Sequence, residues 1–257
     1  WGEKVYKLDD LNLEHGGGNF QCVSTGDAFM STLVLDENPV YDANNIISIF
    51  KEYHNVDVTI YDSLPAGVDA TGHIDMWLMS LSDTDILIGE FNPDVSGYDE
   101  TEDAAADLES RGYTVWRTPS YNSGPDGTGG THYTYTNAAI VNNKVFIPKY
   151  NQSNDTTALA VFEAAMPDHE IIQVDCSSII DYAGAIHCVM KHVYTSDPTT
   201  WDVYLGTDPC DLELIRQYVP KPTCDPGPLD SCTEYHWQVV AENNCGRTPG
   251  NVWSFTT

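Results

Sequence analysis

The chain has 257 residues, enough for one large domain and a smaller one. Hydrophobic residues make up 41% of it, so we expect a packed core rather than a disordered chain. The formal net charge is −28, from 39 acidic and 11 basic residues, and it argues against nucleic acid as a partner because phosphate groups would be repelled. It would attract a cation, although solubility in a salty medium is the plainer explanation.

Cysteine usage favours an oxidising compartment. Four of the seven cysteines, Cys210, Cys224, Cys232 and Cys245, fall within the last 48 residues. Zinc is the competing interpretation, but their spacing contains no Cys-x-x-Cys pair, so no metal is expected. No stretch approaches the roughly 20 apolar residues of a membrane span. The first residues resemble neither a signal peptide nor a natural start, and we expect a longer, secreted or cell-surface precursor.

Strand-like and helix-like runs follow one another in the same order three times, as a ββαβ unit. The predicted strands are 19–24, 28–35 and 56–61, then 74–80, 86–89 and 113–117, then 135–141, 145–148 and 170–175; the predicted helices are 43–54, 100–111 and 155–166. A fourth unit begins near Gly184. Such repeats stack into a ring or solenoid, because one unit cannot bury its own apolar face.

Polar residues at one phase of the repeat would then converge. Asn19, Asp75, Asn137 and Cys188 lie at or beside the first strand of successive units, and we expect them to meet at one end of a central axis. His73 and Asp75 are two positions apart, so in an extended segment their side chains point to the same face. A base and a carboxylate would share one site, although a satisfied polar pair is the plainer interpretation of the dipeptide alone.

A free thiol is expected at Cys188, among small and apolar residues that indicate a buried, closely packed segment. If the tail holds two disulfides and Cys22 pairs with Cys176, then Cys188 is the cysteine left over, although a lone buried cysteine is usually inert packing. The glycine run ending at Gly18 allows close approach of a ligand, but it is also ordinary turn material.

Taken in order, five segments resemble the bacterial peptidyl-arginine deiminase and agmatine deiminase family of the guanidino-group modifying superfamily. The segments are HGGGNF at 15–20, VDATGHIDMW at 68–77, YTN at 135–137, FIPKY at 146–150 and AIHC at 185–188. The resemblance covers about residues 10 to 195. It implies a five-bladed α/β propeller of ββαβ units around the active site, of which this chain would form an incomplete ring.

The resemblance also implies roles for individual residues. Cys188 would be the nucleophile, His73 the acid and base, and Asp75 the carboxylate that grips a guanidinium. Asn137 would contact the substrate, and Asn19, Gly18 and Asp69 lie in the matching segments and are further substrate-binding candidates. The expected substrate is a small guanidine such as agmatine or arginine, or peptidyl arginine. Attack by the thiolate, loss of ammonia and hydrolysis of a thiouronium need no cofactor.

One departure from the family concerns its upstream Arg-Asp-x-Gly-Pro segment, whose Asp supplies a second carboxylate to the guanidinium. No such segment stands in this sequence. We therefore expect about two blades of the ring to be missing and residues 1–257 alone to release little or no ammonia from a substrate.

The tail resembles part of a fibronectin type III domain, through alternating segments at 201–207, 235–241 and 252–257. We expect a deiminase-type domain at 1–195 and a partial all-β sandwich module at 196–257, acting as a spacer or as a contact to a cell surface or polymer. Cys232 and Cys245 flank one predicted strand and so cannot pair. Sandwich topology then predicts the disulfides Cys210–Cys232 and Cys224–Cys245.

Two alternatives to deimination remain open. Amidino transfer would use the same nucleophile and histidine and would differ only in its products. An extracellular binding or adhesion protein built on an inactive, truncated deiminase would need none of this chemistry. The presence of Cys188, His73 and Asp75 together argues against the second alternative, and the missing upstream carboxylate argues for it.

Overall fold

The computed structural model describes residues 13–190, 200–219, 224–243 and 246–257. These residues form two compact units, one within 13–190 and one within 200–257. The predicted boundary between residues 195 and 196 lies outside the described residues. Within them, no helix is long and apolar enough to cross a membrane.

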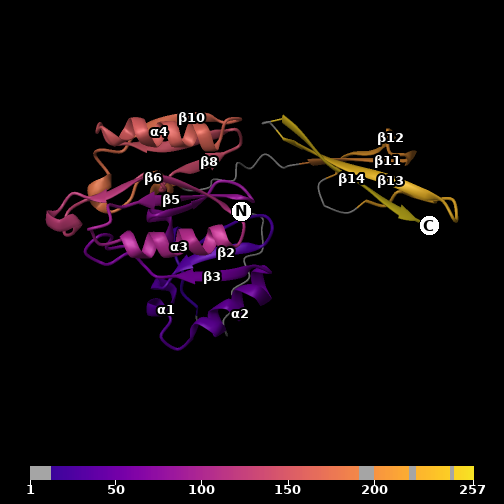
Figure 1. The fold of residues 1–257 in the computed structure, drawn as a ribbon. Coiled ribbons are helices and arrows are strands. Elements are labelled where there is room, and N and C mark those ends of the chain that lie inside the picture. The colour runs from indigo at the N-terminus through magenta and orange to yellow at the C-terminus, as the bar shows by residue number, and fades with distance from the viewer. Residues whose placement is uncertain (1–12, 191–199, 220–223, 244–245) are drawn as a thin grey trace. The chain divides into compact units, whose positions relative to one another are not determined.

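The first unit is a mixed α/β structure, as predicted, and its elements repeat (Figure 1). The first repeat contains β1 (Gln21–Cys22), β2 (Asp27–Ser31), α1 (Leu33–Glu37), α2 (Ala43–His54) and β3 (Asp57–Tyr61), and its sheet has the order β1-β2-β3. Strand β1 is antiparallel to β2, whereas β3 is parallel to it, because α2 carries the chain back to the start of the sheet.

The second and third repeats have the same pairing pattern. The second contains β4 (Leu78–Ser80), β5 (Asp85–Glu90), α3 (Tyr98–Ser110) and β6 (Thr114–Asn122), with β7 (His132–Thr134) added beside β6. The third contains β8 (Ala139–Val141), β9 (Lys144–Lys149), α4 (Asn154–Ala165) and β10 (Glu170–Asp175), in the order β10-β9-β8. Short helices η3 (Pro125–Gly127), η4 (Ile180–Tyr182) and α5 (Ile186–Val189) complete the unit. The predicted ββαβ repeat is therefore confirmed.

Helix α2 spans the residues that the sequence predicts, and its ends explain why. The Asp42 side chain accepts a hydrogen bond from the backbone N–H of Asn45, and the Asn45 side chain accepts one from the backbone of Asp42, which makes a capping box. At the other end Asn55 takes a left-handed conformation with φ 55°, a common way to end a helix. Ile46 and Phe50 lie on the buried face.

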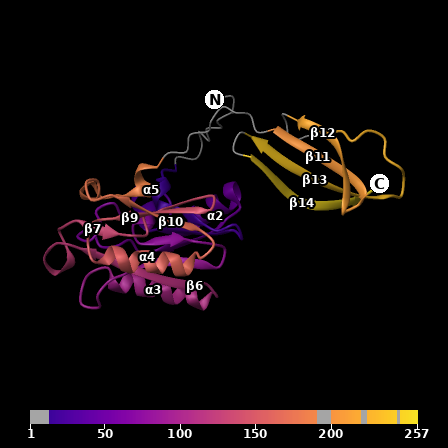
Figure 2. The same cartoon turned by 90° about the horizontal axis from the view of Figure 1, so that it is seen from above.

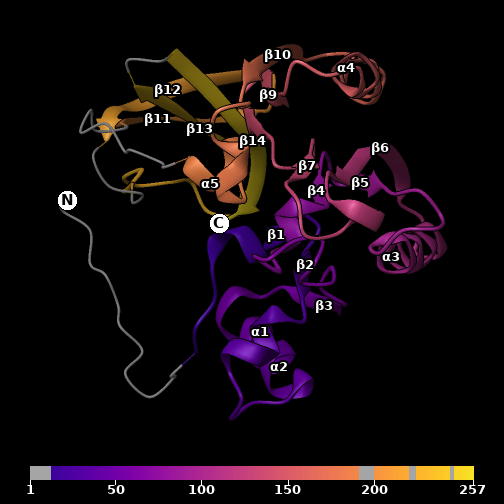
Figure 3. The same ribbon diagram turned by 90° about the vertical axis from the view of Figure 1, so that its left-hand side faces the viewer.

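Helices α3 and α4 contact the sheet of the preceding repeat as well as their own, so neighbouring repeats are held together. Helices α2, α3 and α4 lie around the outside of an arc of three sheets (Figure 3). The Tyr61 hydroxyl of β3 donates to Asp107 of α3 at 2.7 Å, and Arg111 after α3 forms an ion pair with Asp27 of β2 at 2.9 Å. These contacts between the first and second repeats fix the relative positions of the segments that precede β1 and β4.

Turns replace the beginnings of the predicted first strands. Residues 17–19 form the short helix η1 (Gly17–Asn19), residues 74–76 form η2 (Ile74–Met76), and only the last part of the predicted strand 135–141 is extended, as β8. His73 is the residue before η2 and Asp75 lies inside it, so the extended pairing predicted for these two side chains is wrong. The reason is a tertiary contact, because Asn19 Oδ1 accepts from the backbone N–H of Ile74 at 3.1 Å.

The second unit is one antiparallel sheet of four strands in the order β12-β11-β13-β14 (Figure 2). The strands are β11 (Thr200–Asp208), β12 (Asp211–Val219), β13 (Glu234–Asn243) and β14 (Gly246–Thr256). One open cavity of about 590 Å³ borders this sheet, and its lining is apolar: Trp201, Val203, Leu205, Ile215, Cys224, Pro226, Trp237, Val239, Trp253 and Phe255. No second sheet lies among the described residues of this unit, so the sandwich stays a prediction.

The predicted disulfide Cys210–Cys232 is wrong, because both cysteines are free. Cys210 lies in the turn that leads from β11 to β12, where the Asp208 side chain holds its backbone N–H. The backbone N–H of Cys232 instead donates to Thr257, just after β14. Strand β11 pairs with β13 as far as Gly206 opposite His236, so the two cysteines lie at the same end of neighbouring strands, but each is held in its own turn and they form no disulfide.

The predicted pairing of Cys22 with Cys176 is also wrong. Cys22 is exposed on β1 in the first sheet, whereas Cys176 is buried after β10 in the core of the third repeat, and both are free. The sheet of the second repeat separates them along the arc. Cys224 is free as well, and its predicted partner Cys245 lies outside the described residues. The described residues therefore contain no disulfide that would support an oxidising compartment.

Candidate active site

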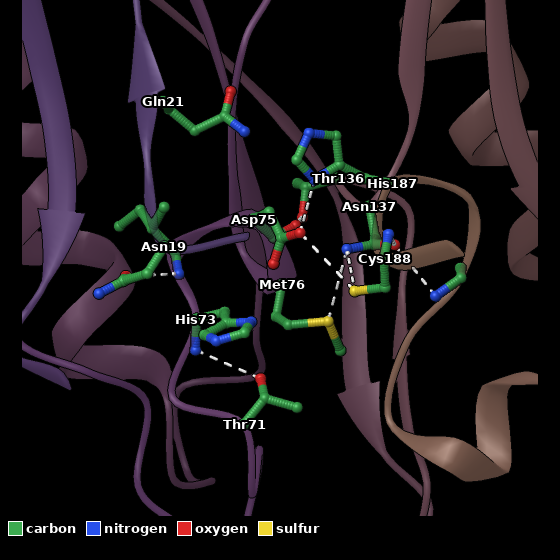
Figure 4. A network of polar contacts seen from close by, with 12 residues as sticks. Asn19, Gln21, Thr71, His73, Asp75, Met76, Thr136, Asn137, His187 and Cys188 are labelled. Carbon is green, nitrogen blue, oxygen red and sulfur yellow. Dashed lines mark hydrogen bonds and ion pairs between the residues drawn. The ribbon is translucent and has the colours of Figure 1, made fainter. Parts of the chain in front are cut away.

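Asp75 lies at the centre of a polar cluster where the segments preceding β1, β4 and β8 meet α5 (Figure 4). Its side chain is 0% exposed. Oδ2 accepts a hydrogen bond from His187 Nδ1 at 2.7 Å, and an ionised carboxylate can only accept, so the imidazole is the donor. Oδ1 has no hydrogen-bond partner among the described residues. A buried carboxylate with an unpartnered oxygen is costly, and its presence indicates a site for a cationic ligand.

Cys188 lies on the one-turn helix α5, and its thiol faces Asp75. As a residue Cys188 is exposed, but Sγ points inward and lies 3.7 Å from Asp75 Oδ2 (Figure 4). Gly184 makes this turn possible, because a Cβ atom at that position would lie 2.9 Å from the sulfur. The small residues before Cys188 in the sequence thus let its side chain lie close to the backbone.

Asn137 holds the turn that carries Cys188. Its side-chain oxygen accepts from the backbone N–H groups of Ala185 at 3.0 Å and Cys188 at 3.2 Å, and its Nδ2 donates to Cys188 Sγ at 3.1 Å. Its backbone carbonyl accepts from Ile186 and His187. The resemblance implies a substrate contact at this position; in the structure the Asn137 amide is engaged with the Cys188 thiol and its turn.

The pKa of the Cys188 thiol is raised to about 11. Burial of the sulfur is the main cause, and the negative charge of Asp75 adds to it, since a thiolate beside a carboxylate is repelled. The hydrogen bond from Asn137 acts in the opposite direction. Without a ligand, the Cys188 side chain is therefore a neutral thiol at physiological pH, and a cation between the two groups would favour the thiolate.

Gly18 brings the first repeat against His73 and Asp75. A Cβ atom at Gly18 would lie 2.7 Å from His73 Nδ1 and 3.1 Å from Asp75 Oδ2, and one at Gly16 would lie 3.3 Å from His73 Nε2. Any side chain at Gly18 would thus displace one of these two groups. The glycine run is part of the wall of the site, and its lack of side chains lets the backbone approach the imidazole and the carboxylate.

The side chains of Asn19 and Asp69, both predicted to contact the substrate, instead form hydrogen bonds within the protein. The buried Asn19 side chain accepts from Ser31 and from the backbone of Ile74, and donates to the Ser31 carbonyl, which fixes η2 against β2. Asp69 is buried and accepts from Thr71 and Gly72, and burial raises the pKa of its carboxyl. Each side chain shapes the segment that carries His73 and Asp75.

Two residues that contact Asp75 were not singled out from the sequence. Thr136 Oγ1 donates to the Asp75 backbone carbonyl at 3.1 Å, and His187 contacts the carboxylate itself. The signal for them in the sequence is weak: each residue stands next to a predicted site residue within a family segment. No group of three or more His, Cys, Asp or Glu side chains within the described ranges is placed to hold a metal ion.

The fold and the cluster define a mixed α/β protein of repeated ββαβ units with a thiol and a carboxylate in one site. Residues 2–193 match the Porphyromonas-type peptidyl-arginine deiminase family. The match covers well over half of the chain, and the chain belongs to this family. The resemblance inferred from the sequence segments is thereby confirmed.

The curated relatives of this chain include agmatine deiminases. The agmatine deiminase of Ectopseudomonas mendocina is 21% identical over 222 residues, which cover 74% of this chain and 59% of the relative. That of Pseudomonas aeruginosa is 23% identical over 218 residues, which cover 72% of this chain and 58% of the relative. The chain therefore spans a little over half the length of these relatives.

Solved structures share the fold of this chain. The agmatine deiminase of C. jejuni superimposes with a TM-score of 0.63 at 20% identity, covering 72% of this chain and 57% of that protein. The agmatine deiminase of Enterococcus faecalis gives a TM-score of 0.58 at 21% identity, covering 66% of this chain and 55% of that protein. At these identities the likeness concerns the fold alone.

Proposed function

We propose that the complete protein hydrolyses a guanidinium group to a ureido group and ammonia, with Cys188 as the nucleophile. The observation that carries this proposal is the buried Asp75 carboxylate: Oδ2 lies 3.7 Å from Cys188 Sγ, and Oδ1 has no hydrogen-bond partner among the described residues. Membership of the deiminase family supports it independently. The site selects a planar cation that can donate hydrogen bonds while exposing an electrophilic carbon.

A guanidinium meets these requirements better than an ammonium. Its N–H groups lie in one plane and match the spacing of carboxylate oxygens, and charge-assisted bonds of this kind are about twice as strong as neutral ones. Its central carbon then faces the sulfur at a fixed distance. Its positive charge would also separate Asp75 from the thiolate, so that binding of the substrate lowers the pKa that burial has raised.

The proposed reaction uses Cys188 and His73 in two stages. The thiolate sulfur attacks the guanidinium carbon to form a C–S bond, and one C–N bond breaks as His73 protonates the departing ammonia. Water, deprotonated by His73, then attacks the thiouronium carbon; the C–S bond breaks, and the ureido product and the thiolate are released. The half-buried His73 ring beside Gly16 and Gly18 is near enough to Asp75 to serve the same ligand.

Activity is proposed for the complete protein because the chain spans only 59% and 58% of the two curated relatives compared above. In the family an upstream aspartate supplies a second carboxylate to the guanidinium. Losing one hydrogen bond to a charged group costs about 1.5–3 kcal/mol, which is about 10- to 150-fold in binding. Residues 1–257 alone are therefore expected to bind a guanidine weakly and to turn it over slowly.

Free and peptidyl substrates would present the same guanidinium group to the reacting centre. The named relatives act on agmatine, whereas the family is described by peptidyl arginine. The part of the substrate that does not react would be recognised by segments outside the cluster, such as the loop at 120–131 that Asn122 ties down through Gly124 and Gly130. We propose a guanidine-bearing substrate without specifying the group attached to the guanidine.

For the second unit we propose a spacer or a contact to a surface or polymer, in a secreted protein. The aromatic and aliphatic side chains on one side of its sheet support a binding role. The acidic composition of the chain is compatible with an extracellular location.

Ammonia release from agmatine and from benzoyl-arginine amide tests the proposal, using residues 1–257 and a chain extended with its natural upstream sequence. We expect activity in the extended chain and its loss in Cys188→Ala. His73→Ala should at most form the thiouronium slowly. Citrulline or a ureido amine as the product supports hydrolysis, whereas a new amidino compound would indicate amidino transfer. Equal rates for Cys188→Ala and its parent would favour a binding protein instead.

A further inference from the structure

His187 donates a short hydrogen bond to the Asp75 carboxylate, with 2.7 Å between Nδ1 and Oδ2. Asp75 is 0% exposed, and the His187 side chain is 29% exposed. The two residues are 112 positions apart, so this bond joins the turn carrying the nucleophile to the segment carrying the carboxylate. The proposed chemistry assigns His187 no step, although it stands next to the nucleophile in sequence.

The oxygen that His187 contacts is also the one nearest the thiol. Cys188 Sγ lies 3.7 Å from Asp75 Oδ2, and Oδ1 has no partner among the described residues. A hydrogen bond to Oδ2 withdraws negative charge from the side of the carboxylate that repels a thiolate, and it leaves Oδ1 for a ligand. The two carboxylate oxygens therefore differ: Oδ2 is bonded to the imidazole beside the thiol, and Oδ1 is available to a ligand.

We propose that His187 is a positioning residue that acts through Asp75: by donating from Nδ1 to Oδ2 it lets Cys188 ionise beside the carboxylate and reserves Oδ1 for the guanidinium. This inference rests on the proposed function for the identity of the ligand, but the effect of His187 on the thiol requires no substrate. Around the thiol, the titratable groups that matter are Asp75 from η2, His187 from α5 and His73, which precedes η2.

The experiment measures alkylation of Cys188 by iodoacetamide, which is uncharged, between pH 7 and pH 11 on the whole chain. Mass spectrometry must assign the label, because Cys22, Cys210 and Cys232 are also exposed. We expect His187→Ala to shift the rate profile to higher pH and to slow labelling at pH 8 about three- to tenfold. The threefold value applies if the greater nucleophilicity of a more basic thiolate partly compensates for the smaller fraction of thiolate.

Two further variants separate this role from a purely structural one. In His187→Asn the amide nitrogen takes the place of Nδ1, and we expect the parent profile to return. In His187→Gln the nitrogen corresponds to Nε2 instead, and the profile should stay close to that of His187→Ala. The thermal unfolding midpoint of each variant reports on folding. If His187→Asn behaved like the alanine variant while remaining folded, a hydrogen bond from the δ position would be the wrong explanation.

The decisive comparison uses an Asp75→Asn background, which removes the charge through which His187 is proposed to act. There, His187→Ala should change the alkylation profile by less than about twofold. A full effect in this background, or none in the parent, would overturn the proposal. Saturable inactivation by 2-chloroacetamidine, a cationic amidine, is measured in parallel on the parent. Its absence would count against the guanidinium site, while the iodoacetamide profiles would still decide the role of His187.

Discussion

Asn137 Nδ2 lies 3.1 Å from Cys188 Sγ, while the Oδ1 atom of the same amide accepts from the Cys188 backbone N–H at 3.2 Å. One side chain therefore holds Cys188 at both its backbone and its sulfur. Because the Nδ2 donor stabilises a thiolate, it partly offsets the burial and the Asp75 charge that raise the pKa of the thiol.

Asn137→Asp should slow alkylation of Cys188 at pH 8 by about tenfold or more. The substitution keeps the shape and an acceptor for the Ala185 and Cys188 backbone, but it replaces the donor with a second negative charge near the sulfur. Labelling by iodoacetamide, assigned by mass spectrometry, measures the effect. Asn143→Asp is a control, since Asn143 is an exposed residue between β8 and β9. An unchanged rate in Asn137→Asp would mean that the amide does not influence the thiol.

The ligand-free chain should label Cys188 faster with each step in pH until about pH 11. The sign follows from the pKa, since the reactive thiolate forms as pH rises towards the raised value of about 11. Below that value the thiolate fraction increases about tenfold per pH unit. Stopped samples analysed by mass spectrometry give the profile. A plateau near pH 8.5 would contradict the raised pKa.

Much of the fold is predictable from local sequence. Helix α2 spans the predicted residues because its capping residues and apolar spacing lie within the helix and its flanks. Strand β10 also has its predicted bounds, between the turn after α4 and Cys176. The ββαβ repeat could be read for the same reason, since each unit is built from neighbouring elements.

The site was predictable only as far as the family segments extend. The turn at η2 depends on a hydrogen bond between Asn19 and Ile74, 55 residues apart, and local alternation of apolar residues gives no sign of it. The contact between His187 and Asp75 spans 112 residues. The disulfide predictions failed because they were derived from cysteine parity and an assumed sandwich, neither of which determines whether two sulfur atoms come within bonding distance.

Phe162→Ala should lower the free energy of unfolding of the first unit by about 3–5 kcal/mol, the usual cost of removing a fully buried aromatic ring. Phe162 is 0% exposed on α4, in the core of the third repeat. Urea denaturation followed by circular dichroism measures the change. Glu163→Ala is the matched control, because Glu163 is the next residue of the same helix and is exposed, so a change within about 0.5 kcal/mol is expected.

Asp75→Asn should change two reactions of Cys188 in opposite directions. Removing the negative charge eliminates one cause of the raised pKa, so labelling by uncharged iodoacetamide should become faster at pH 8. Inactivation by cationic 2-chloroacetamidine should lose its saturation, because the carboxylate that would hold the amidinium is gone. The asparagine can still accept from His187. If both reagents slowed to the same extent, a general distortion of the site would explain the result better than charge.

Gly18→Ala should abolish saturable inactivation by 2-chloroacetamidine, whereas Gly17→Ala should leave it within about twofold of the parent. Both glycines lie in η1, so their local backbone is the same type of turn. A Cβ atom at Gly18 would lie 2.7 Å from His73 Nδ1, whereas one at Gly17 would have no other atom within 4 Å. The added methyl group would therefore displace His73 or Asp75 in Gly18→Ala, whereas in Gly17→Ala it would contact neither residue. Inactivation rates at several reagent concentrations, with thermal unfolding midpoints for both variants, distinguish a blocked site from misfolding. Equal inactivation of the two folded variants would show that the first repeat does not form a wall of the site.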